Sequence, residues 1–66
     1  MNIIRSSYTG HPTTGATIFV AVYEHPEARR MRFSVSSRWE TFRSFTTIEA
    51  ATAWFETFIQ EHADAR

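Results

Sequence analysis

Hydrophobic and polar residues follow two different periods along this chain, one typical of β-strands and the other of an α-helix. Residues 16–24 carry apolar side chains on both faces, which is typical of a strand at the centre of a sheet. In residues 30–36, Met31, Phe33 and Val35 alternate with polar positions and predict a strand with one buried face. Both patterns have the period of two that distinguishes a strand from a helix.

Two further strands are predicted from less regular patterns. Residues 39–45 form one of them, although Phe42 differs in parity from Trp39 and Phe45. A β-bulge would bring these aromatic residues to one face, and an outward-pointing Trp39 would also remove the conflict. Residues 2–8 could form a short edge strand.

Residues 46–63 show the 3.6-residue period of an amphipathic helix. Thr46 is the predicted N-cap, and Glu49, three residues later, completes a capping box. We expect the apolar stripe to cover the sheet face that carries Val20 and Val22, and His62 to interact with the helix C-terminus. The stripe consists of Ile48, Ala51, Trp54, Phe55, Phe58, Ile59 and His62.

These elements predict one α+β domain over residues 1–66. Its architecture is a three- or four-stranded antiparallel β-meander with one C-terminal amphipathic helix packed on one face. Because a single helix covers a single face, the opposite face of the sheet is expected to be open. The residues predicted to lie there and to contact a partner are Phe19, Tyr23, Arg30, Arg32, Trp39 and Arg43.

The composition limits how so small a domain can be stabilised. The chain has 66 residues, no cysteine, six Phe, two Trp and two Tyr. Domains of this length bury about 60% of their unfolded surface, so dense aromatic packing or self-association must compensate for the missing disulfides. No apolar run approaches the roughly 20 residues of a membrane span, and residues 1–5 lack the core of a signal peptide. A cytoplasmic protein is therefore expected.

Charge is segregated along the chain, although the net charge is zero. All seven basic residues are arginines, and residues 29–43 hold five of them with a single glutamate. Residues 49–64 hold four acidic residues and no basic ones. We therefore expect a basic, aromatic sheet face and an acidic helix face, with Glu49 and Glu56 as a second contact surface.

The sequence contains no motif for catalysis or metal binding. His11, His25 and His62 are not spaced as a ligand pair, and no cysteine completes a tetrahedral site. The two glycines do not form a phosphate-binding loop, and no serine or threonine stands in a nucleophile motif. The prediction is a protein without enzymatic activity, cofactor or metal.

The order of three strands followed by a helix, with Phe45 closing the sheet, resembles two kinds of known protein. One is the three-stranded DNA-binding domain of phage integrases and AP2-type plant transcription factors, in which the sheet enters the major groove. Those domains are rich in lysine and glycine and carry net positive charge. This chain has no lysine, two glycines and no net charge.

The other resemblance is to small phage-encoded anti-CRISPR proteins of Pseudomonas that act on type I surveillance complexes. It is carried by the pattern of residues 18–24 and by residues 44–49 with Ala53, Trp54 and Phe55. This resemblance covers about half of the chain. It implies an inhibitor that binds a host effector complex and blocks target DNA, with no chemistry of its own.

Three functions are therefore considered. The first is a phage anti-defence inhibitor that binds a bacterial CRISPR effector complex by protein–protein contact in the host cytoplasm. The second is a nucleic-acid-binding module that uses a basic sheet face, whose affinity would fall steeply with salt. The third is a small homodimeric structural or regulatory protein.

Overall fold

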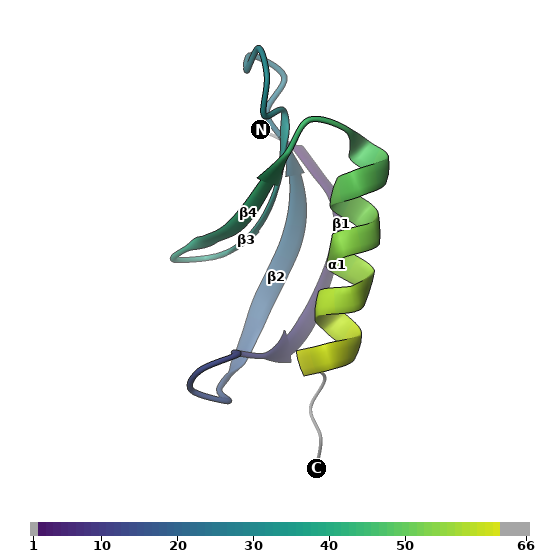
Figure 1. Ribbon diagram of the computed structural model, residues 1–66. Coiled ribbons are helices and arrows are strands. Elements are labelled where there is room, and N and C mark those ends of the chain that lie inside the picture. The colour runs from purple at the N-terminus through teal and green to yellow at the C-terminus, as the bar shows by residue number, and fades with distance from the viewer. Residues whose placement is uncertain (1, 63–66) are drawn as a thin grey trace.

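The computed structural model describes residues 2–62 (Figure 1). Four antiparallel strands form one sheet in the order β1-β2-β3-β4, and the helix packs against one face of it, which confirms the α+β prediction. In chain order the elements are β1 (Asn2–Gly10), β2 (Thr17–Glu24), β3 (Phe33–Ser37), β4 (Thr41–Phe45) and α1 (Ile48–His62).

The third strand starts later than the alternating pattern predicted. It begins at Phe33, whose partner Glu24 is the last residue of β2. Because β2 ends at Glu24, shortly before Pro26, no residue of β2 lies opposite Met31. Met31 is therefore 54% exposed, and its predicted place in the core is wrong.

A bulge in β4 resolves the parity conflict among its aromatic residues. Val35 pairs with Arg43 and Ser36 with Thr41, so Phe42 lies between two register positions without a partner. Phe42 and Phe45 both pack against the core, because the extra residue brings them to the same face. Trp39 lies before β4, in the turn, and is 87% exposed.

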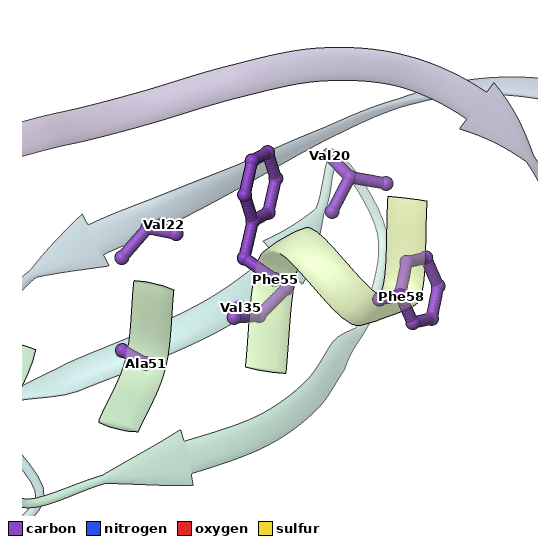
Figure 2. Close-up of a cluster of buried hydrophobic side chains, with 6 residues drawn as sticks. All are labelled: Val20, Val22, Val35, Ala51, Phe55 and Phe58. Carbon is purple, nitrogen blue, oxygen red and sulfur yellow. The ribbon is translucent and has the colours of Figure 1, made fainter. Parts of the chain in front are cut away.

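The core lies between α1 and the centre of the sheet. Figure 2 shows side chains from β2, β3 and the helix meeting there. Trp54 extends this core, with its ring centroid 5.8 Å from Phe45 and 5.2 Å from Phe58. Each fully buried Phe contributes roughly 1.5–3 kcal/mol, so aromatic packing supplies much of the stability of this small domain. The buried residues of the cluster are Val20, Val22, Val35, Ala51, Phe55 and Phe58.

The N-cap of α1 lies one residue after the predicted Thr46, and the helix begins at Ile48. The Thr47 side-chain oxygen accepts a hydrogen bond from the Ala50 backbone N–H at 3.2 Å, which makes Thr47 the N-cap. The predicted capping box of Thr46 and Glu49 is therefore wrong, because Ala50 now stands three residues after the cap. Glu49 remains in the first turn, where its charge favours the helix dipole.

The C-terminal end of the helix is fastened to the end of β1. The buried Thr9 hydroxyl donates to the His62 carbonyl oxygen at 2.8 Å, and His62 Nδ1 lies 3.0 Å from the Phe58 carbonyl. The predicted role of His62 at the helix terminus is confirmed. A Cβ atom on Gly10 would lie 3.0 Å from the same His62 oxygen, so glycine permits this close approach.

Candidate functional site

The face of the sheet that α1 does not cover, called the open face below, carries aromatic side chains from β1 and β2. Tyr8 pairs with Phe19 across the two strands, and their ring centroids are 5.6 Å apart in an edge-to-face arrangement. Ile3 pairs with Tyr23 further along the same strands. Tyr8 is 71% exposed and Ile3 54% exposed. Large apolar groups therefore meet solvent on this face.

The turn between β3 and β4 adds a tryptophan and an arginine at its tip. Ser37 Oγ accepts the backbone N–H groups of Trp39 and Glu40 at 3.3 and 3.2 Å, which fixes the turn. The Arg38 guanidinium lies 5.5 Å from the centre of the Trp39 ring. This end of the hairpin projects away from α1 (Figure 1). Arg38 and Trp39 are thus presented on the side opposite the helix.

Two hollows adjoin this turn, and both are lined by Ser37, Arg38 and Trp39. The larger hollow, of about 440 Å³, is also lined by Tyr23, His25, Ser36, Glu40 and Thr41. The smaller hollow, of about 300 Å³, is also lined by Tyr8, Thr17, Ile18 and Phe19. The turn therefore forms part of the wall of two concave regions on the surface.

A chain of hydrogen bonds runs beside the larger hollow. His25 Nε2 lies 2.8 Å from Ser34 Oγ, and Ser34 Oγ lies 3.2 Å from Ser36 Oγ. Ser36 in turn donates to Thr41 Oγ1 at 3.2 Å. Ser34 and Ser36 are only 4% and 8% exposed, and both buried hydroxyl groups have hydrogen-bond partners. Such a satisfied polar network holds the surrounding side chains in fixed positions.

The structure disperses the six residues predicted to form a basic, aromatic face. Phe19, Tyr23 and Trp39 lie on the open face or its turn, as expected. Arg30 and Arg32 are exposed in the β2–β3 loop, where the Arg32 N–H donates to the Arg30 carbonyl at 2.8 Å. They lie outside the sheet for the same reason as Met31: β2 has ended.

Arg43 also lies elsewhere than predicted. Its register partner is Val35, a core residue, so its side chain starts on the helix-covered side of the sheet. There its guanidinium lies 5.8 Å from the centre of the Phe45 ring. The bulge at Phe42 causes this placement because it reverses the alternation of the strand.

The predicted second surface is partly occupied by an internal ion pair. Glu56 pairs with Arg5 of β1, and both side chains are about half exposed. Glu49 is exposed in the first turn of α1 and contributes to the acidic side of the helix. The acidic surface is therefore less charged than the sequence suggests, because Arg5 lies against it.

Sequence reasoning missed several residues that the structure brings to the open face. Tyr8 joins Phe19 because the first hairpin pairs Gly10 with Thr17 and continues in register to these two residues. His25 and Arg38 line the larger hollow, although both stand in connections between strands. An aromatic pair at Tyr8 and Phe19 could have been anticipated only from the register of the first hairpin.

The hydrogen bond between His25 and Ser34 resembles the contact between a base and a nucleophile. However, the Ser34 hydroxyl is buried and also engaged with Ser36, so a substrate could not approach it. Within residues 2–62, no group of three or more His, Cys, Asp or Glu side chains is arranged to hold a metal ion. The geometry of the open face supports binding by shape and aromatic contact.

In the described part of the chain, no helix has the length and apolarity needed to cross a membrane. No protein family, curated protein or solved structure matches the chain.

Proposed function

We propose that this protein is a binding protein that acts through protein–protein contact at its open face and has no chemistry of its own. The observation that carries the proposal is the set of exposed aromatic side chains on the face opposite α1. Tyr8 and Trp39 are 71% and 87% exposed, and Phe19 and Tyr23 lie between them on β2. A rigid surface of this composition favours recognition of another protein.

The chemistry and size of the open face support this role. Tryptophan, tyrosine and arginine are enriched among the residues that dominate binding energy in protein interfaces. A standard interface buries about 800 Å² on each partner. The accessible surface is 4667 Å², so one face of the molecule is large enough to provide such an interface.

The partner that we propose is a bacterial CRISPR surveillance complex of type I. The resemblance of residues 18–24 and 44–49 to anti-CRISPR inhibitors supports this choice. The protein would then act as a phage anti-defence inhibitor that blocks target DNA binding or cleavage. The aromatic open face would supply the contact with the complex.

The test is co-elution of the purified protein with a type I surveillance complex, together with an assay of target DNA binding by that complex. Trp39→Ala removes an exposed side chain of the turn and should weaken binding at least about ten-fold, as expected for an interface residue that contributes 1.4 kcal/mol or more. Met31→Ala is the matched control, because Met31 is also exposed and apolar but lies in the β2–β3 loop. Binding that is equal for both variants would contradict the proposal.

The dispersal of the arginines argues against the nucleic-acid alternative. Arg30 and Arg32 lie in a loop and Arg43 on the other side of the sheet, so Trp39 and Phe19 have few cations beside them. Retention of duplex or single-stranded DNA in a salt-sensitive manner would favour that alternative. A doubled mass in solution that Trp39→Ala reduces to the monomer would instead show that a second copy occupies the open face.

A further inference from the structure

Arg38 is the one cation among the described residues that line the larger hollow beside the β3–β4 turn. No carboxylate of residues 2–62 lies within ion-pairing distance of the Arg38 guanidinium. Glu40 also lines the hollow, but its carboxylate accepts a hydrogen bond from His11 Nε2 at 2.7 Å. His25 and Ser36 also line the wall, and their hydrogen bonds run to Ser34 and Thr41. An anionic group that enters the hollow would therefore meet Arg38 as its donor.

The hydrogen bonds of the His11 ring hold Glu40 beside the β1–β2 loop. His11 Nδ1 accepts the backbone N–H groups of Thr13 and Thr14 at 3.0 and 3.3 Å. Nε2 therefore carries the proton and donates it to Glu40. Because Glu40 is held by the β1–β2 loop, Arg38 has no counter-charge among residues 2–62.

Aromatic side chains border this hollow. Tyr23 and Trp39 line it, and the guanidinium of Arg38 lies 5.5 Å from the centre of the Trp39 ring. A cation–π contact of this kind leaves the guanidinium N–H groups able to pair with a carboxylate. A volume of about 440 Å³ is in the range of sites that bind small groups.

From this arrangement we infer that the larger hollow binds an aspartate or glutamate side chain from an acidic segment of the partner protein that also carries aromatic residues. The carboxylate would pair with Arg38, and a neighbouring aromatic ring would pack against Trp39 or Tyr23. The inference rests on the proposed function, because it names the chemistry that the open face selects in its partner.

The distribution of the other cations favours a protein segment over a nucleic acid. A phosphate backbone is bound by a row of cations, each neutralising one phosphate. Arg5 is paired with Glu56 on the helix side, and Arg43 lies on the helix-covered side of the sheet. Arg38 is thus a single cation beside aromatic rings, which matches one carboxylate better than a chain of phosphates.

The test uses nuclear magnetic resonance of the whole ¹⁵N-labelled protein. The probe is an acetylated and amidated Glu-Phe-Glu-Phe peptide at up to millimolar concentration, and the matched probe is Gln-Phe-Gln-Phe. The signals followed are the indole N–H of Trp39 and the backbone amides of Ser36 and Thr41. Arg38→Gln removes the proposed cation, and Arg29→Gln is the charge-matched control in the exposed β2–β3 loop. A short oligothymidylate provides the nucleic-acid comparison.

The acidic peptide should shift these signals saturably, and Arg38→Gln should weaken its binding about ten-fold while Arg29→Gln leaves it unchanged. The glutamine peptide should bind about ten-fold more weakly than the acidic one to the unmodified protein. Absence of a saturable shift, equal binding of the two peptides, or equal binding by Arg38→Gln would each overturn the inference. Tighter binding of the oligothymidylate at the same signals would overturn it in favour of nucleic acid.

The two proposals can fail separately. If Trp39→Ala weakens capture of the surveillance complex and Arg38→Gln does not, the open face is the interface but the carboxylate contact is wrong. If Trp39→Ala has no effect on capture, the proposed function itself fails, whatever the peptides do.

Discussion

Gly15 occupies a backbone conformation that few other residues adopt. Its φ is +76°, in the left-handed region, at the end of the loop between β1 and β2. The loop is closed by the Gly15 N–H donating to the His11 carbonyl at 2.9 Å and by the His11 ring, which accepts two backbone N–H groups. The geometry of this loop therefore depends on one glycine and one histidine, and through His11 it also sets the position of Glu40.

Gly15→Ala should lower the free energy of unfolding by about 1–2 kcal/mol, because a Cβ atom is disfavoured at this φ. No atom lies within 4 Å of the position such a Cβ would take, so the effect isolates backbone strain. Gly15→Asn should be milder, since asparagine tolerates the left-handed region. Urea denaturation measures both, and equal stability of the alanine variant would contradict the assigned conformation.

At the scale of elements, bulges decide which side chains face the helix. Ile4 in β1 and Phe42 in β4 each lie between two register positions, and each packs against the core. In both strands the next residue is an arginine that starts on the same side: Arg5, which reaches Glu56, and Arg43, which lies near the Phe45 ring. Both edges of the sheet thus flank the helix with an apolar residue and a cation, which also discourages edge-to-edge pairing.

The start of α1 offers a second test at this scale. Thr47→Ala should destabilise the protein by about 1 kcal/mol because it removes the acceptor of the Ala50 N–H. Thr46→Ala is the matched control and should change stability by only a few tenths of that amount. Thermal unfolding followed by circular dichroism compares them. A larger loss of stability for Thr46→Ala than for Thr47→Ala would show that Thr46 is the N-cap, as the sequence predicted.

At the scale of the whole molecule, the sheet separates two surfaces of different character. The helix side carries Glu49, Glu56 and the cations of the two edge strands. The open face carries aromatic side chains with Arg38 as the cation of the turn. The basic face expected from the charge run of residues 29–43 does not form, since its arginines are shared among a loop, a turn and the helix side.

This separation predicts a shallow dependence of partner binding on salt. Contact through Arg38 alone should give a slope of log affinity against log salt concentration near −1, whereas five arginines on phosphates would give about −4.5 by the counterion-release relation for duplex DNA. Affinity for the surveillance complex measured over a range of salt concentrations distinguishes the two. A slope steeper than about −3 would show that the arginines act together and that the open face is not the main contact.

The pattern of apolar residues was sufficient to predict two elements of the fold, α1 and β2. The apolar stripe of α1 was evident from its spacing, and its members Ala51, Phe55 and Phe58 are buried. Residues 16–24 carried apolar side chains on both faces, and β2 is indeed an inner strand of the sheet. These features follow from side-chain periodicity, which each segment carries within itself.

The candidate site was decided by tertiary structure, because strand register depends on two segments at once. The alternation of residues 30–36 is the same whether or not β2 continues beside them; the end of β2 at Glu24 is what leaves Arg30 and Arg32 in a loop. The bulge at Ile4 brings Ile3 to the open face, and the bulge at Phe42 removes Arg43 from it. The sequence by itself determined the helix, the central strand and the existence of an uncovered face. The composition of that face was set only when the strands paired, since a shift of one residue reverses every side chain beyond it.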